Sequence, residues 1–386
     1  MNLWEIAAIL SIVFYAVALL WAGTGVRYCS RASRRLALPG IAGPSVSLVT
    51  AIRNEERNLS EFLQCLKNQN LSRDRFETVL VNDRSDDGSE RIIAEWADQF
   101  DFKVVEVQSV PSRYNPKKFA LLNGIKNAGH EVILLTDADC RPGPGWAFGM
   151  ASCFGPEIIA VVGFSPVMSR TKWLSPLLLI DSLAVAVHMM AGVGWNRPYM
   201  VTGRNLAYRR SSFWKVGGYE SHLKVTSGDD DLLIQQLTAT PSSRIGFALS
   251  PETHVVSLGP ESLAAWLCQK RRHFAAGKKY PPTVQLGYAL FHLSNLVLWL
   301  APIFLGRMGI LVLAGKVLGD YFVLRQTSRE LSGRGAQDFQ PAFVLRRGKS
   351  ALQFSNLAFL GWEALHLIFH TLVAPSSWSG RIRWKE

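Results

Sequence analysis

The chain has 386 residues, of which 48% are hydrophobic and 19% charged, and its formal net charge is +12. The hydrophobic residues are concentrated in four stretches with very few charges: residues 3–23, 286–305, 308–324 and 351–373. About 20 mainly apolar residues are enough for a helix to cross a bilayer. The composition therefore excludes an ordinary cytosolic enzyme, a disordered chain and a secreted disulfide scaffold, and it predicts a membrane protein with a large water-facing middle.

Cysteine spacing and the distribution of basic residues indicate the compartment. The five cysteines are widely spaced without a CxxC pair, so we expect reduced thiols facing the cytosol rather than a zinc site or disulfide framework. Basic residues lie beside the apolar stretches, as the positive-inside rule requires: Arg27, Arg31, Arg34, Arg35, Arg325, Arg329, Arg334, Arg346, Arg347 and Lys349. Such residues attract anionic lipid head groups. The expected partner is therefore a lipid bilayer and not a nucleic acid.

The first apolar stretch has no basic segment before it and no clear small-residue cleavage site after it. Residues 1–24 are therefore predicted to be an uncleaved transmembrane anchor rather than a signal peptide. The arginines that follow place the next segment in the cytoplasm. We expect a multi-pass protein of the cell (inner) membrane.

Residues 45–280 open with strand and helix signals in alternation. Strand runs at 46–52, 76–82, 102–107 and 131–136 alternate with helical periodicity at 56–69, 89–100 and 117–128. This order predicts βαβ units in an α/β, Rossmann-like domain with a mainly parallel sheet, whose ligand site lies beyond the carboxyl ends of the strands.

Residues 173–193 are apolar enough to suggest another transmembrane helix. Pro176, Asp181 and His188 interrupt the run, and a crossing there would split the domain across the membrane. We therefore expect an interfacial or buried helix.

Acidic side chains follow the predicted strands. Asp137 and Asp139, in the sequence TDAD, can lie near one divalent cation and a ribose or phosphate, as a diphosphate leaving group requires. A polar turn is the alternative, because a DxD motif is short. Glu55 follows the first strand and Asp83 the second, so three loops converge on one sheet edge, where a carboxylate can accept hydrogen bonds from a base or ribose.

Three further segments could contribute to the same site. Lys117 opens a predicted helix, where it could meet a phosphate or be an exposed lysine. Asp229, Asp230 and Asp231 are adjacent acids that repel one another, so a raised pKa on one would suit a general base, whereas helix capping is the structural alternative. The sequence QKRRH at 269–273 could be a basic juxtamembrane face or part of the site.

The order of these motifs resembles that of the membrane-bound inverting glycosyltransferases of family 2, which have the GT-A fold. The resemblance covers about residues 45–280 and rests on seven segments: VSLVTAIRNEERNL, VNDRSDDGS, KKFALLNGI, LLTDADC, TGRNLAYRRSSFWKVGGYE, SGDDDLL and QKRRH. It implies a hexosyltransferase that uses a nucleotide-sugar donor, most simply a UDP-sugar, and Mg²⁺ or Mn²⁺ as a cofactor. It also implies a cytoplasmic GT-A domain flanked by transmembrane helices.

The resemblance implies a role for each matching position. At the donor site, Asp83 contacts a uridine-type base, Asp137 the nucleotide and Asp139 the metal. Glu55 and Lys117 are added to the predicted nucleotide-sugar contacts because of their own positions in the chain. At the acceptor, Asp229 is the catalytic base, and Gln269 and Arg272 lie near the diphosphate and acceptor.

The sequence departs from the family pattern at two positions. Gly228 stands where the family usually has Glu, so either the neighbour that assists the base is missing or Asp230 or Asp231 takes over its role. His273 replaces the tryptophan that stacks on the acceptor sugar in processive polysaccharide synthases, which counts against long-chain polymerisation.

The predicted function is transfer of a sugar to a hydroxyl of a membrane lipid, because Tyr280 abuts the second apolar stretch and brings the site to the bilayer surface. A glycerolipid, a sphingolipid-like lipid, a hopanoid and a hydroxylated carotenoid remain open as acceptors. The alternatives are a processive polysaccharide synthase and a catalytically silent protein that binds nucleotide sugar.

The last apolar stretches leave the topology open. Residues 286–373 are predicted to form transmembrane or re-entrant helices, and 308–324 is the re-entrant candidate because four full crossings would put the basic tail, 374–386, outside. Glu363, His366 and His370 are expected on one helix face, where they could be metal ligands, line a lipid head-group passage or pair with other helices.

Overall fold

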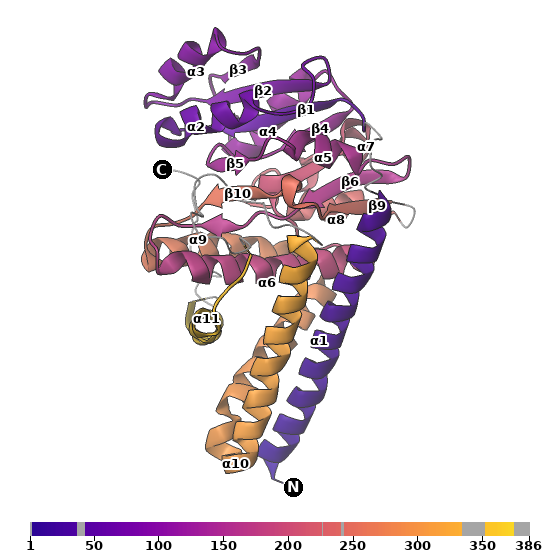
Figure 1. The fold of residues 1–386 in the computed structure, drawn as a ribbon, viewed down its shortest axis with the longest axis vertical. Helices are drawn as coiled ribbons and strands as arrows, with labels where there is room; N and C mark the ends of the chain where they lie inside the picture. Colours follow the sequence, from indigo (N-terminus) through magenta and orange to yellow (C-terminus); the bar gives the residue numbers. More distant parts are fainter. Residues whose placement is uncertain (1, 37–42, 226, 241–242, 334–351, 374–386) are drawn as a thin grey trace.

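The computed structural model describes residues 2–36, 43–225, 227–240, 243–333 and 352–373. Its centre is a seven-stranded sheet of order β3-β2-β1-β4-β8-β6-β9 (Figure 1). The strands are β1 Val46–Ile52, β2 Phe76–Asp83, β3 Lys103–Val107, β4 Val132–Leu135, β6 Ile158–Gly163, β8 Leu206–Arg209 and β9 Arg244–Ala248. Only β8 runs antiparallel to its neighbours, so the predicted mainly parallel, Rossmann-like sheet is confirmed.

The sheet is buried on both faces, as continuous apolar strand runs predict. Successive residues of β1 point to opposite sides: Leu48 packs in one core cluster and Val49 in the other. Helices α2 (Glu56–Lys67), α3 (Ser89–Ala97) and α5 (Trp146–Ser152) contribute to the first cluster, and α4 (Pro116–Asn127) contributes to the second.

A small second sheet joins the loops beyond the strand ends. It has the order β5-β10-β7, with β5 Cys140–Pro142, β7 Val167–Met168 and β10 Val255–Leu258. The remaining helices of this part are α6 Leu174–Gly194, α7 Arg210–Lys215, α8 Asp231–Leu237 and α9 Leu263–Ala276.

Two long helical elements project from the domain. Helix α1 (Leu3–Leu36) lies beside α10 (Pro282–Ser332), which breaks into two arms at Gly306, where φ is 53° and ψ is −129° (Figure 1). Phe304 of the first arm stacks on Trp4, with ring centroids 3.7 Å apart. Gln326 of the second arm donates to the Gly23 carbonyl at 2.8 Å. Both arms therefore follow α1 along most of its length.

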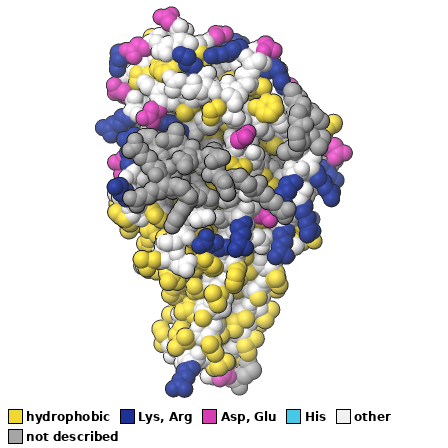
Figure 2. All heavy atoms as spheres, in the orientation of Figure 1, with side chains coloured by type: hydrophobic (Ala, Val, Ile, Leu, Met, Phe, Trp, Pro, Cys, Tyr) yellow, Lys and Arg dark blue, Asp and Glu magenta, His cyan; other side chains and the backbone are white. Residues whose placement is uncertain are grey.

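In the part of the chain that the structure describes, three helices are long and apolar enough to cross a membrane: α1, α6 and α10. The projecting helices expose apolar side chains, including Leu10, Leu20, Leu311 and Phe322. Figure 2 shows hydrophobic side chains over these helices and a row of Lys and Arg where they meet the domain. Helix α6 runs across the direction of α1 and α10 in Figure 1, and 67% of its most apolar window is buried, in keeping with the expected buried helix.

The last two apolar stretches form helical elements of different length. Residues 308–324 belong to the second arm of α10, where the Tyr15 hydroxyl of α1 donates to Asp320 at 2.9 Å, and the re-entrant assignment of this stretch stays a prediction. The stretch 351–373 contains the short helix α11 (Asn356–Ile368) and a π-helical turn, Phe369–Val373, and it is not among the three candidate spans. Helix α11 is seen nearly end-on in Figure 1, across the projecting helices. The predicted tail, 374–386, lies outside the described residues.

Candidate active site

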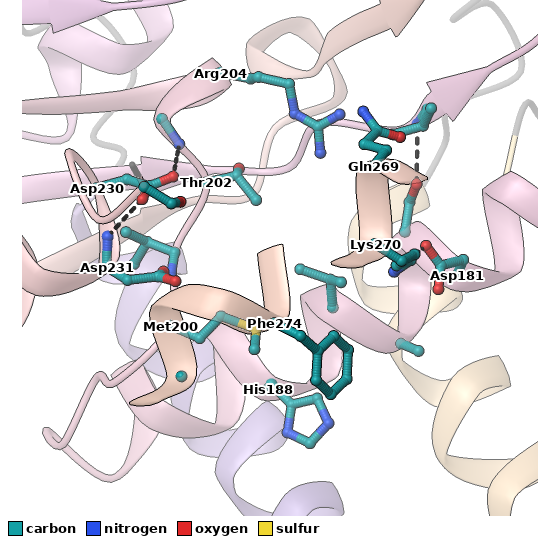
Figure 3. Close-up of a pocket in the computed structure, with 18 of the residues that line it drawn as sticks. Asp181, His188, Met200, Thr202, Arg204, Asp230, Asp231, Gln269, Lys270 and Phe274 are labelled. Carbon is teal, nitrogen blue, oxygen red and sulfur yellow. Dashed lines mark hydrogen bonds and ion pairs between the residues drawn. The ribbon is translucent and has the colours of Figure 1, made fainter. Parts of the chain in front are cut away.

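A cavity of about 910 Å³ lies between the carboxyl edge of the sheet and helices α6, α9, α10 and α11. Figure 3 shows Arg204 and Gln269 approaching it from one side and Asp230 and Asp231 from the other. Its lining includes the predicted site residues Glu55, Lys117, Asp137, Asp139, Asp229, Asp230, Asp231 and Gln269. Loops that are far apart in sequence thus meet as the parallel-sheet prediction requires.

Lys117 connects two of the predicted acidic motifs. Its helix, α4, begins where the Asn115 side chain accepts a hydrogen bond from the backbone of Lys118 and Pro116 occupies the first helical position. The Lys117 ammonium lies 3.1 Å from Asp137 and 3.0 Å from Asp229. In this structure Lys117 is therefore neither an exposed lysine nor unpaired.

The ion pair affects the protonation of Asp229. Burial raises the pKa of Asp229, but the charges of Lys117 and Lys118 and the hydrogen bond from Lys117 outweigh burial and lower the pKa below its ordinary value. Burial lowers the pKa of Lys117, but the charges of Asp137, Asp229 and Asp230 outweigh burial and raise it well above its usual value. Asp229 is consequently ionised at neutral pH.

The two acids that follow Asp229 in the chain, Asp230 and Asp231, have raised pKa values. Burial and then the charge of Asp229 raise the pKa of Asp230 to about 6. Its carboxylate accepts hydrogen bonds from the backbone of Asp231 at 2.7 Å and Gly203 at 2.8 Å, and so caps α8. Burial and the charge of Asp230 raise the pKa of Asp231. Asp231 accepts hydrogen bonds from the Val201 backbone at 2.7 Å and the Tyr280 hydroxyl. The structural alternative, helix capping, thus describes the position of Asp230.

The glycine at position 228 has a backbone reason. Gly228 has φ of +87°, a conformation that other residues adopt rarely. A Cβ atom added there would lie 2.6 Å from a methyl carbon of Leu232. The glutamate usual in the family therefore does not fit this loop conformation.

Sequence reasoning missed Lys118. Its side chain is fully buried, and its ammonium donates to the carbonyl oxygens of His222, Val225 and Ser227 at 2.7, 2.9 and 2.9 Å. These bonds use all three donors of a lysine. Burial lowers the pKa of Lys118 to about 8. Lys118 thus holds the loop that leads to Asp229, and its only sequence signal is its position beside Lys117.

The acidic pair after β4 has a donor set that suits a hard cation. Asp137 and Asp139 both line the cavity. Among the residues that the structure describes, no group of three His, Cys, Asp or Glu side chains could hold a metal. Mg²⁺ is commonly bound by one or two carboxylates together with water and substrate phosphates, so two carboxylates fit such an ion when a diphosphate is present.

Arg204 lines the cavity, and sequence reasoning assigned it no role. Its backbone carbonyl accepts a hydrogen bond from Thr136 Oγ1 at 2.8 Å, directly before Asp137. The next residue, Asn205, is fully buried and donates to the carbonyls of Phe164 at 2.9 Å and Thr253 at 2.8 Å. These hydrogen bonds hold the short helical turn Gly203–Asn205 in place, with Arg204 at the cavity (Figure 3).

Asp83 lies behind the cavity lining rather than in it. The carboxylate is fully buried and contacts Arg84 Nε at 2.8 Å and Arg53 at 3.8 Å. Glu55 precedes α2, where its carboxylate accepts a hydrogen bond from Asn58 at 2.9 Å, and it lines the cavity.

Helix α9 carries the QKRRH segment along the cavity. Gln269 and Lys270 line it, and Lys270 forms an ion pair of 2.5 Å with Asp181 of α6. Arg272 and His273 also belong to α9, but their side chains lie outside the described part of the chain.

The three polar residues predicted on one face of the last apolar stretch separate in the structure. His366 and His370 line the cavity, and their Nε2 atoms lie 2.8 Å apart. Glu363 is buried against Lys316 of α10, which also pairs with Asp320 at 3.0 Å. Glu363 thus pairs with another helix, whereas both histidines face the cavity.

Comparison with known proteins identifies the class. Residues 47–217 match the family described as Glycosyl transferase family 2. The chain is 27% identical over 244 residues to the probable glycosyltransferase YdaM of Bacillus subtilis, covering 61% of this chain and 56% of that protein. It is also 27% identical over 162 residues to the poly-β-1,6-N-acetyl-D-glucosamine synthase of Staphylococcus epidermidis, covering 38% of each. The aligned region thus spans about half or less of these relatives.

A solved structure extends the likeness of the fold. The mannosyltransferase PcManGT from Pyrobaculum calidifontis, in complex with GDP-Man and Mn²⁺, matches with a TM-score of 0.52 at 20% identity, covering 95% of this chain and 99% of that one. Residues 47–217 form a glycosyl transferase family 2 domain, and the chain has the GT-A fold. Both predictions are confirmed, and the matched region lies within the predicted domain, 45–280.

Proposed function

We propose that this glycosyltransferase moves a hexose from a nucleotide sugar to a hydroxyl of a membrane lipid, with inversion at the anomeric carbon. The observation that carries the proposal is one continuous cavity, which joins the carboxylates at the sheet edge to the helices next to the projecting pair. A donor with a charged diphosphate suits the sheet edge, and a lipid suits the helical end. The proposed organisation is a membrane anchor at 1–24, a cytoplasmic catalytic domain at 45–280 and membrane-associated helices at 286–373.

Asp229 is the proposed base. Its ionised carboxylate takes the proton of the acceptor hydroxyl while that oxygen forms a bond to the anomeric carbon and the bond from this carbon to the diphosphate oxygen breaks. The electron pair leaves with the nucleoside diphosphate. One displacement inverts the configuration, so an α-linked donor gives a β-glycoside.

The donor site is proposed around the other carboxylates. Mg²⁺ or Mn²⁺ on Asp139, with Asp137 beside the nucleotide, would supply positive charge to the departing diphosphate. Gln269, Arg272 and Arg204 are the proposed protein contacts of that diphosphate. The complex of PcManGT with GDP-Man and Mn²⁺ supports a nucleotide-sugar donor and a divalent cation here.

Asp83 is proposed to bind the base, with Glu55 and Lys117 also on the donor side. Asp83 Oδ2 lies 3.8 Å from Arg53 and accepts no hydrogen bond within the described residues, so it retains acceptor capacity for an N–H donor. A uracil base offers such a group, which favours a UDP-sugar. Asp230 and Asp231 support the α8 loop in this scheme, and His273 lies on the acceptor side.

Transfer by the purified full chain tests the proposal. The protein is placed in lipid nanodiscs with Mn²⁺, a panel of nucleotide sugars and a cell lipid extract, and a β-linked single-sugar lipid is expected. Asp229→Asn should abolish transfer and keep donor binding within about twofold. Asp230→Asn is the matched control, which retains turnover because its carboxamide oxygen can still cap α8. Unimpaired turnover in Asp229→Asn would show that the base is misassigned.

A processive polysaccharide synthase is the second candidate, and the likeness to the poly-β-1,6-N-acetyl-D-glucosamine synthase favours it. Product size decides between the two, since a long polymer without glycolipid supports the synthase. A catalytically silent sugar-nucleotide-binding protein is the third, and donor turnover by the purified protein would exclude it.

A further inference from the structure

The helical end of the cavity contains four histidines. His188 of α6, His292 of α10 and His366 and His370 of α11 and the turn after it all line the cavity; we call this group the histidine chamber. His292 stacks on His370 with ring centroids 3.8 Å apart and lies 6.2 Å from His366. Three helices thus bring imidazoles from distant parts of the chain to one place.

His292 has unused hydrogen-bonding capacity. Both of its ring nitrogens are buried and have no hydrogen-bond partner in the described part of the protein. His188 differs, because its Nδ1 lies 2.7 Å from the Tyr199 hydroxyl, and the Nε2 atoms of His366 and His370 face each other. A buried polar group without a partner costs free energy, so an unpaired imidazole at a cavity wall is suited to a ligand that supplies the missing bonds.

The chamber geometry does not favour a metal. The rings of His292 and His370 are nearly parallel, at 17°, so their nitrogens do not converge on one point as metal ligands do. The absence of a three-ligand group from the described residues agrees with this. Hydrogen bonding is the chemistry that the ring arrangement leaves open.

The charges around the cavity indicate what kind of ligand fits. Of the lysines and arginines that line it in the described residues, Arg53, Lys117 and Arg204 lie on the sheet side. Lys270, the one from α9, is neutralised by Asp181 at 2.5 Å. The chamber side instead presents aromatic and imidazole rings, including Trp266, Tyr288 and Phe369. Among the described residues a phosphate group there would find no unpaired cation, whereas a hydroxyl would find both a donor and an acceptor.

We propose that the histidine chamber is a subsite for an uncharged, hydroxyl-bearing part of the acceptor, with His292 as its main hydrogen-bonding residue. The inference rests on the proposed lipid glycosyltransferase function and narrows its acceptor to a neutral lipid rather than a lipid phosphate. Gln285, Tyr288 and His292 line the cavity from successive turns of α10, and seven residues of helix span about 10 Å. The chamber thus holds the acceptor at a second point, away from the reacting hydroxyl.

Two substitutions of His292 separate hydrogen bonding from shape. His292→Phe keeps a flat ring against His370 and removes both nitrogens, whereas His292→Gln keeps a donor and an acceptor. The full chain in nanodiscs is tested with its best nucleotide sugar and with lipid extract from cells lacking the protein, separated by anion exchange into uncharged and acidic fractions. Donor binding is measured in parallel.

The expected wild-type result is transfer to the uncharged fraction. His292→Phe should raise the half-saturating lipid concentration at least tenfold and leave donor binding within twofold. In His292→Gln the half-saturating lipid concentration should return most of the way to the wild-type value. Three outcomes would overturn the subsite and leave the glycosyltransferase proposal intact. They are an unchanged half-saturating lipid concentration in His292→Phe, transfer only to the acidic lipid fraction, and stoichiometric Zn²⁺ that the wild type binds and His292→Phe loses. No lipid transfer by the wild type, with donor turnover present, would refute the lipid-acceptor function itself.

Discussion

Lys117 sets the protonation of the proposed base, and its removal should move the pH dependence of transfer. In Lys117→Met the ammonium 3.0 Å from Asp229 is lost while the burial of Asp229 remains. Burial alone raises the pKa of a carboxyl group. The acid limb of the pH profile should therefore move to higher pH.

The distance gives an upper limit for this change in pKa. At an effective dielectric constant of about 20, two unit charges about 3 Å apart interact by about 5.5 kcal/mol. Lys117→Met removes this stabilisation of the ionised carboxylate, so the pKa of Asp229 should rise. Water in the cavity and the remaining charge of Lys118 reduce the size of the rise without changing its direction.

The assay is the pH dependence of kcat/KM between pH 4.5 and 9 with saturating Mn²⁺. Lys117→Met should lose activity at pH 5–6 relative to its own value at pH 8.5, while the wild type remains active to lower pH. Lys126→Met, a change at an exposed lysine on the same helix, is the matched control and should keep the wild-type profile. An acid limb that stays in place in Lys117→Met would refute the ion-pair argument for Asp229.

Two further predictions concern the same loop. Lys118→Met leaves three carbonyl oxygens without their donor and should lower the free energy of unfolding by about 2–4 kcal/mol, measured against Lys126→Met in detergent; equal stability of the two would contradict the supporting role. Because the folded-state pKa of Asp230 is about 6, above the ordinary 3.8, the folded protein binds an extra proton between these values and loses stability as pH rises through them. Asp230→Asn should remove that loss of stability, which is about 1.4 kcal/mol for each pH unit between the two pKa values, while keeping the helix cap. Thermal unfolding of both proteins from pH 4 to 7 measures the effect. The same dependence of stability on pH in the wild type and in Asp230→Asn would count against it.

The sequence could predict the elements and the edge at which the site forms. Buried strands of a parallel sheet are nearly continuous apolar runs, so 46–52 and 131–136 could be recognised locally. Once β1 and β4 are parallel neighbours, the residues after them must lie at one edge, which is why Glu55 and Asp137 were expected near one another. These predictions needed only periodicity and chain order.

Other features depend on contacts that chain order does not reveal. Lys117 and Lys118 are adjacent lysines, but Lys117 points to the cavity and Lys118 into the protein. The difference arises because three backbone carbonyls from a distant part of the chain accept the hydrogen bonds of Lys118. The two arms of α10 are separated by the positive φ of Gly306. The sequence shows two neighbouring apolar runs, but it does not reveal the conformation of the glycine between them. The stacking of His292 on His370 joins residues 78 positions apart.

The conformation at Gly228 bears on whether the departure from the family sequence removes activity. A glutamate at this position would have a positive φ and a Cβ atom too close to Leu232, so it would need another backbone conformation. The loop therefore differs from a family loop in its conformation, and the change is more than the loss of one side chain. That loop still places Asp229 at the cavity, with Lys118 bonded to the carbonyl of Ser227 two residues before it. The charge next to the proposed base then comes from Lys117, which favours the ionised form that a general base requires. The glycine is therefore compatible with an active transferase and gives no support to a catalytically silent protein.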